Sequence, residues 1–136
     1  MSRKRLVFFV LLFAASLALA ACAGGSGGST SIAVTFTDFK FDPTEFTVPA
    51  GQTITIKTTN EGAVLHEFVI MNLGTTAGDK FGDEDEANIY WEVETEPGQS
   101  NTMTFTAPAE AGEYQLICGT EGHLEAGMVG TFTVVK

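Results

Sequence analysis

The chain has 136 residues, of which 44% are hydrophobic and 18% charged, and this length and balance predict one globular domain with its own core. Acidic residues dominate, because 17 Asp and Glu stand against 7 Lys and Arg and give a net charge of −10. A phosphate backbone attracts the opposite charge, so this composition excludes nucleic acid as an expected partner.

The N-terminal segment has the pattern of an export signal. Three basic residues at positions 3–5 precede an apolar run from Leu6 to Ala21, which is too short and wrongly flanked for a membrane span. The run ends in Leu19-Ala20-Ala21-Cys22, which resembles the lipobox of bacterial lipoproteins. We expect a signal peptide over 1–21 and lipidation at Cys22. Cleavage at an Ala-x-Ala site without a lipid, or an uncleaved anchor, are the alternatives.

A stretch rich in Gly and Ser separates this signal from the rest of the chain. Residues 22–31 lack apolar periodicity and are expected to form a flexible tether. Its root-mean-square reach is about 15–18 Å by the flexible-chain estimate, so a domain over 32–136 would lie close to the membrane surface. Removal of the three basic residues at 3–5 would leave 4 bases against 17 acids, a net charge near −13.

The domain over 32–136 has short runs with two-residue alternation and no convincing helix. In one run Ile54 and Ile56 face inward, and in another Met103 and Phe105 do so. We expect strands at 32–41, 45–48, 52–59, 64–71, 89–94, 102–106, 113–118 and 129–135. An acidic loop over 72–88, with a short helical turn near its end, joins two of them. Short strands with Gly and Pro turns predict an all-β Greek-key sandwich of seven to eight strands.

Four nitrogen- and sulfur-bearing side chains carry the chemistry. Cys118, His123 and Met128 lie in one loop between two predicted strands, and His66 lies on a distant strand. One thiolate, two imidazoles and a weak axial thioether are the ligand set of a blue-copper electron-transfer centre. Each residue considered separately is more often a core residue, so the inference depends on the combination and its spacing. Cys22 is assigned to the lipid, which leaves Cys118 without a disulfide partner.

The domain resembles the cupredoxin family along its whole length. The Cys-x4-His-x4-Met spacing is similar to that of auracyanins, rusticyanin and sulfocyanin, whereas plastocyanin has a shorter Cys–His gap and azurin a shorter His–Met gap. The resemblance implies one type 1 copper ion. Its implied equatorial ligands are His66, Cys118 and His123, and its axial ligand is Met128.

Two positions depart from the family pattern. Glu121 stands where relatives often have Pro, and Glu67 follows the first His where Asn or Ser is common. A carboxylate near the Cys sulfur would disfavour Cu(I), because it adds negative charge to an anionic site. We expect these changes to affect the redox potential and not the choice of metal.

The family resemblance implies a monomeric one-electron carrier that is not an enzyme, at the outer face of a bacterial membrane. Its partner would be a redox protein such as a c-type cytochrome or a terminal oxidase. In the family, the His in the position of His123 presents its ring edge through an apolar patch. The expected docking surface consists of Leu124, Ala126 and Gly127, rimmed by Glu121 and Glu125. The acidic run 79–86 is either a solvated loop or a second docking patch.

Two other functions remain open. An extracytoplasmic copper chaperone or copper-resistance protein should favour exposed Met and His, yet the chain has only 4 Met and 2 His. An interaction module with a vestigial site predicts that no coloured copper form exists. Copper oxidases and nitrite reductases need further His ligands, and a two-copper centre needs a second Cys in the loop, so we do not expect an enzyme.

Overall fold

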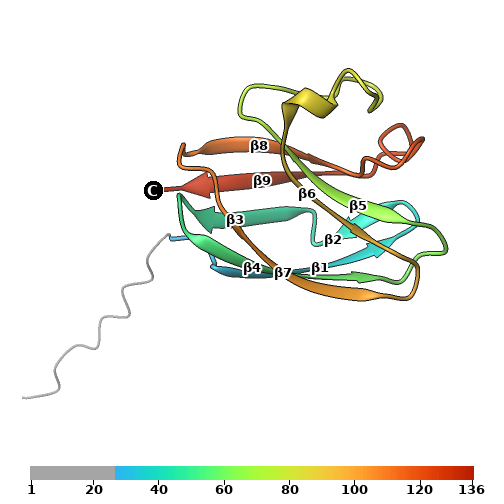
Figure 1. Ribbon diagram of the computed structural model, residues 1–136, viewed down its shortest axis with the longest axis horizontal. Helices are drawn as coiled ribbons and strands as arrows, with labels where there is room; N and C mark the ends of the chain where they lie inside the picture. The colour runs from blue at the N-terminus through green and yellow to red at the C-terminus, as the bar shows by residue number, and fades with distance from the viewer. Residues whose placement is uncertain (1–26) are drawn as a thin grey trace, which may run out of the picture.

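A computed structural model describes residues 27–136 as two facing β-sheets (Figure 1). The expected signal peptide over 1–21 and the lipidated Cys22 lie outside the described residues. Over residues 27–136 the strands are β1 (Ser31–Thr37), β2 (Lys40–Asp42), β3 (Glu45–Pro49), β4 (Thr53–Asn60), β5 (His66–Met71), β6 (Ile89–Thr95), β7 (Ser100–Thr106), β8 (Gly112–Ile117) and β9 (Val129–Val135). A short 3-10 turn, η1 (Glu86–Asn88), precedes β6.

One sheet has the order β2-β1-β4-β7 and the other β3-β9-β8-β5-β6. Most neighbours are antiparallel, but β1 pairs with β4 and β3 with β9 in parallel. The chain therefore crosses between the sheets after β2, β3, β4, β6 and β7. This arrangement confirms the all-β sandwich expected from the alternation of the sequence.

Two details differ from the expected strands. The single run over 32–41 is divided, because the chain reverses at Asp38 and Phe39 and Thr37 pairs with Lys40 in a tight hairpin. The described residues therefore hold nine strands instead of seven to eight. Met103 lies opposite Ile56 on the expected inner face, but it is 44% exposed because β7 is an edge strand.

The start of the domain also differs from the expected boundary. Strand β1 begins at Ser31, and the amide of Ser29 donates a hydrogen bond to the Thr47 carbonyl at 2.8 Å. The last residues of the expected tether over 22–31 are therefore part of the sandwich. Within residues 27–136, no helix has the length and apolar character that a membrane crossing needs.

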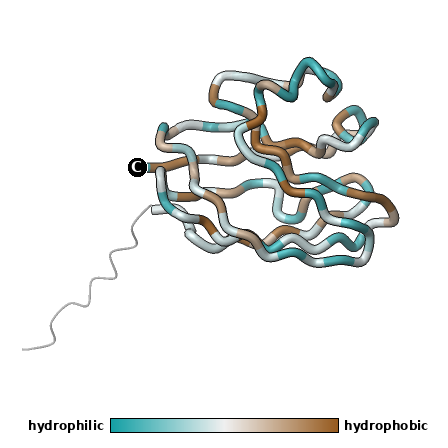
Figure 2. Tube along the Cα trace, viewed as in Figure 1, coloured by the Kyte–Doolittle hydropathy of each residue, from teal (hydrophilic) through white to brown (hydrophobic). Residues whose placement is uncertain are grey.

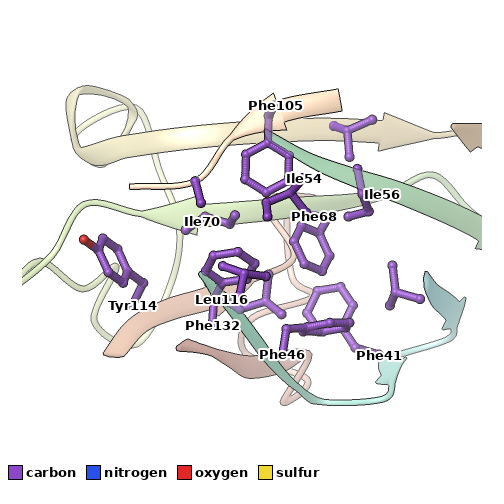
Figure 3. Close-up of a cluster of buried hydrophobic side chains, with 14 of the residues drawn as sticks. Phe41, Phe46, Ile54, Ile56, Phe68, Ile70, Phe105, Tyr114, Leu116 and Phe132 are labelled. Carbon is purple, nitrogen blue, oxygen red and sulfur yellow. The ribbon is translucent and has the colours of Figure 1, made fainter. Parts of the chain in front are cut away.

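The core lies between the sheets and is rich in aromatic rings (Figure 3). Phe68 from β5 contacts Phe41 and Phe46 edge-on, with ring centroids 5.8 and 5.3 Å apart. Phe105 stacks on Trp91 at 4.2 Å. Burial of one such ring contributes about 1.5–3 kcal/mol, so this cluster contributes substantially to the stability of the sandwich.

Strand β5 is buried on both faces. His66, Phe68 and Ile70 point to the main core, whereas Val69 and Met71 belong to a second cluster on the outer face. That cluster is covered by the segment between β5 and β6, whose projecting tip is mostly hydrophilic (Figure 2). The loop from β8 to β9 lies at the same end of the sandwich as the β1–β2 turn, and the C-terminus lies at the opposite end (Figure 1).

Candidate metal centre

Three of the four predicted ligands meet at one end of the sandwich. His66 is the first residue of β5, Cys118 directly follows β8, and His123 lies in the loop before β9. Their ligand atoms lie within 4.8 Å of one another, and all three residues are buried. Cys118 Sγ is 3.2 Å from His123 Nδ1 and 3.8 Å from His66 Nδ1. The pairing of β5 with β8 explains why these residues, distant in sequence, converge.

Hydrogen bonds close the loop that carries the other ligands. The Cys118 amide donates to the Met128 carbonyl at 3.1 Å, and the Met128 amide donates to the His123 carbonyl at 3.0 Å. Gly122 and Gly127 have φ values of 81° and 91°, which other residues adopt at a cost. Met128 is fully buried and packs in the same core cluster as Cys118. The structure thus ties Met128 to both loop ligands through the backbone and places its side chain in the interior.

The Cys118 sulfur receives a backbone hydrogen bond from the distant strand. The amide of Glu67 donates to Cys118 Sγ at 3.3 Å, and the Thr120 hydroxyl donates to the Leu65 carbonyl at 3.2 Å. Burial raises the pKa of the Cys118 thiol, and hydrogen bonds from Glu67 and Thr120 partly oppose this increase. A metal that binds here must therefore displace the thiol proton.

His66 makes a second contact that the sequence did not reveal. Its Nε2 lies 2.8 Å from Asp38 Oδ1, in the turn between β1 and β2. Hydrogen bonds from the Ala63 amide and then from His66 hold the pKa of the Asp38 carboxyl below its usual value. The sequence pattern predicts a continuous strand over 32–41, and this hides the turn that brings Asp38 to His66.

Phe39, the neighbour of Asp38, covers the other imidazole. Its ring lies edge-on to His123 with centroids 4.7 Å apart, yet Phe39 itself is 44% exposed. Burial and then the charge of His66 lower the pKa of His123, which favours the neutral imidazole that a metal requires. Alternation over 32–41 does not distinguish Phe39 from a core position, because it does not reveal the turn at Asp38 and Phe39.

Leu124 does not lie on the expected docking surface. It is only 8% exposed and packs with Val69, Met71, Ala77 and Ile117 against the outer face of β5. The expectation of an exposed Leu124 is therefore wrong, because the loop folds back over a hydrophobic patch that the sequence pattern did not predict. The other expected docking residues, Glu121, Glu125, Ala126 and Gly127, are exposed.

Glu67 faces away from the sulfur on the outer side of β5. Its carboxylate lies over Gly119, where an added Cβ would meet it. Burial, and then the charges of Glu94, Glu92 and Glu86, raise the pKa of Glu67 to about 7. At neutral pH the carboxylate is thus only partly charged, so its influence on the site is weaker than a full negative charge.

A cavity of about 360 Å³ is lined by Lys80, Phe81, Gly82, Asp83, Glu86, Gly119, Glu121 and Glu125.

The donor set and its spacing fit a type 1 copper ion. Three ligand atoms bound at about 2.0–2.3 Å in a near-trigonal arrangement lie roughly 3.5–4 Å apart, taking zinc bond lengths as a guide. The separation of 3.8 Å between Cys118 Sγ and His66 Nδ1 agrees with this geometry, and the separation of 3.2 Å between Cys118 Sγ and His123 Nδ1 is slightly shorter. A soft sulfur and two imidazoles, all buried, are ligands that copper accepts in both oxidation states.

Comparison with known proteins gives an independent assignment. Residues 6–134 match the family model of a cupredoxin-like domain. The chain is 36% identical to auracyanin-A of Chloroflexus aurantiacus, over 88% of this chain and 90% of that protein. It is 33% identical to the copper-resistant cuproprotein CopI of Rubrivivax gelatinosus, over 70% of this chain and 59% of that protein. A reduced auracyanin structure from Roseiflexus castenholzii has a TM-score of 0.69 at 35% identity, covering 81% of this chain and 100% of that one.

Proposed function

Because the chain belongs to the family of cupredoxin-like domains, we propose that it is a blue-copper protein that carries single electrons between redox partners. The observation that supports this function best is the buried convergence of His66 Nδ1, Cys118 Sγ and His123 Nδ1. Bound copper would supply the one-electron redox chemistry, and Met128 is the proposed axial ligand. We expect no enzymatic activity.

The protein's contribution is to hold the ligands in place. His66 is held by a sheet strand, while Cys118 and His123 are held by a loop closed by backbone hydrogen bonds. The Glu67 amide connects the two parts through the sulfur. A site held from both sheet and loop changes little between oxidation states, and this keeps the barrier to electron transfer low.

Electrons are proposed to leave through His123. The exposed ring of Phe39 covers this imidazole, and Ala126 and Gly127 are exposed in the same loop. We define Phe39, Ala126 and Gly127 as the docking patch, with the exposed Glu121 and Glu125 as its acidic rim. A cationic partner, such as a c-type cytochrome or a terminal oxidase, would be steered to it by the rim and by the overall negative charge.

We place the protein at the outer face of a bacterial membrane, anchored through a lipid on Cys22. The proposal is supported by the lipobox-like sequence before Cys22 and the basic residues at positions 3–5. The described chain starts at the end of the sandwich opposite the loop from β8 to β9 (Figure 1). An anchor there would leave the docking patch facing away from the membrane.

A spectrum of the copper-reconstituted protein tests the function. The wild-type protein should show an intense blue band from the thiolate, and Cys118→Ser should lose it while remaining folded. Wild-type protein that binds copper without that band would contradict the proposed centre.

The similarity to CopI supports a second candidate, a copper-resistance protein. Such a protein must release or sequester copper, whereas a carrier must retain it through many cycles. Competition with a Cu(I) chelator separates the two functions. A carrier should keep its metal while a cytochrome repeatedly reduces and oxidises it, whereas a delivery protein should lose its metal to the chelator. The burial of all three proposed equatorial ligands favours retention.

A further inference from the structure

We propose that Asp38 is a positioning residue of the metal centre, whose carboxylate keeps the His66 proton on Nε2 and directs the bare Nδ1 toward Cys118 Sγ. The inference rests on the proposed copper function but concerns the metal-free protein as well. Asp38 lies outside the set of proposed ligands and acts through His66.

The two ring nitrogens of His66 face opposite chemical environments. Nε2 is 2.8 Å from Asp38 Oδ1, and Nδ1 is 3.8 Å from Cys118 Sγ. An ionised carboxylate can only accept hydrogen bonds, so the Nε2 that contacts it must be the donor. A neutral imidazole with its proton on Nε2 has a free lone pair on Nδ1, which is the form that binds a metal.

The carboxylate is itself held in place. The Ala63 amide donates to both Asp38 oxygens, at 3.2 and 3.0 Å. The preceding residue, Gly62, donates its amide to Asn60 Oδ1 at 2.8 Å. Asn60 is anchored in turn, because its Nδ2 donates to the Val64 and Thr95 carbonyls at 2.8 Å each. The turn after β4 thus connects the sheet to the carboxylate that contacts His66.

Gly62 leaves the space in which this contact forms. A Cβ added there would meet Asp38 Oδ1 and would lie 2.7 Å from His66 Nε2. The Asp38 side chain could move aside, but the His66 ring is fully buried, with Phe36 edge-on to it at 6.0 Å between centroids. Any side chain at position 62 should therefore separate the carboxylate from the imidazole.

The contact has two consequences for a bound copper ion. It fixes the orientation of the ring, and outer partners of this kind typically contribute 10–100-fold to metal affinity. Its negative charge also stabilises the oxidised centre relative to the reduced one, so Asp38 lowers the potential.

Nitrogen-15 NMR of the metal-free protein tests the tautomer directly. We expect the wild-type His66 proton on Nε2, and a mixture of both tautomers in Asp38→Ala. A wild-type proton on Nδ1, or an unchanged tautomer in Asp38→Ala, would overturn the proposal. This measurement does not depend on copper chemistry, so a colourless copper form would contradict the proposed function and leave the role of Asp38 standing.

Copper competition and potentiometry supply the second measurement. Asp38→Ala should lower copper affinity about 10–100-fold, and Gly62→Ala should lower it in the same direction. Asp38→Asn keeps an acceptor oxygen, so it should retain most affinity while the potential rises. Glu61→Gln, which removes one exposed charge from the same turn, is the matched control and should change neither tautomer nor affinity. If Asp38→Ala does not fold, an Asp38→Asn potential equal to that of Glu61→Gln would overturn the proposal.

Discussion

Phe39 and His123 form an edge-on aromatic pair with ring centroids 4.7 Å apart, and Phe39 is the partner that reaches solvent. The pair brings the β1–β2 turn against the loop from β8 to β9, so that two segments distant in sequence share one surface. Because His123 itself is nearly buried, a docking protein would meet Phe39 before the imidazole.

Replacement of Phe39 should therefore impair electron transfer. Phe39→Asp places a charge on the apolar docking patch, and we expect the stopped-flow rate with a basic cytochrome to fall at every salt concentration. Transient redox contacts are small, so loss of one central aromatic residue has a large effect. Phe39→Tyr keeps the ring and should leave the rate nearly unchanged.

Leu124 supplies the contrast. Leu124→Ala should cost about 2–5 kcal/mol of unfolding free energy, because a buried side chain is truncated. It should leave the electron-transfer rate of the folded protein close to wild type. If Leu124→Ala slowed electron transfer without loss of stability, and Phe39→Asp left the rate unchanged, the docking surface would include Leu124 instead of Phe39.

The acidic rim should control the salt dependence of the reaction. Salt screens exposed charges over about 8–10 Å at ordinary ionic strength, so the association rate with a cationic partner should fall as salt rises. The pair Glu121→Gln and Glu125→Gln should flatten this dependence. Glu110→Gln with Glu113→Gln removes the same charge near the start of β8, away from Cys118, and serves as control. If both pairs of substitutions flattened the salt dependence equally, the association rate would depend on the net charge of the protein and not on the acidic rim.

Met128 should affect the potential more than the colour. Its thioether is the proposed weak axial ligand, whereas the blue band requires the thiolate. Met128→Leu should keep the band and shift the potential measured by voltammetry. Loss of the blue colour in folded Met128→Leu would mean that the side chain does more than a weak axial ligand.

Glu67 should make the stability of the metal-free protein depend on pH. Burial raises its pKa from 4.5 to about 7, so the folded state holds the proton more tightly than the unfolded state. The resulting stability is complete below pH 4.5 and is lost as pH rises through about 7. The site is only half-buried, and after allowance for solvent screening we expect about 1–2 kcal/mol.

His123 makes the free energy of unfolding change with pH in the opposite direction. Burial lowers its pKa below 6.5, so the stability that its neutral form contributes is lost as pH falls. The difference between wild type and Glu67→Gln in urea unfolding at several pH values isolates the Glu67 contribution. Glu113→Gln is the control for a change of charge alone. A wild-type curve parallel to that of Glu67→Gln between pH 4.5 and 7 would contradict the buried carboxyl.

Lipidation of Cys22 should be visible in the intact mass of protein from the membrane fraction. We expect a mature chain that starts at Cys22 and carries several acyl chains, since one chain alone anchors a protein only weakly. Cys22→Ser should release the protein from that fraction. A mature start at another residue, or an unmodified Cys22 thiol, would rule out the anchor.

The residue order was sufficient to predict the fold class and the chemistry of the centre. Cys118, His123 and Met128 lie within one short loop, so their proximity is a local property that spacing alone conveys. The two-residue alternation identified most strands, and β9 has the predicted bounds because both its ends are marked by a change of pattern. His66 followed by elimination, since the chain has only two His.

The surroundings of the centre depend on contacts between distant segments, which no periodicity encodes. The Asp38–His66 contact joins residues 28 positions apart, and it arises because a hairpin turn meets the start of a strand in the other sheet. Leu124 is buried against expectation, and Phe39 is exposed within an expected strand, for the same reason. Whether a loop side chain is buried depends on which surface the loop covers, and that surface is built by strands whose order in space differs from their order in sequence.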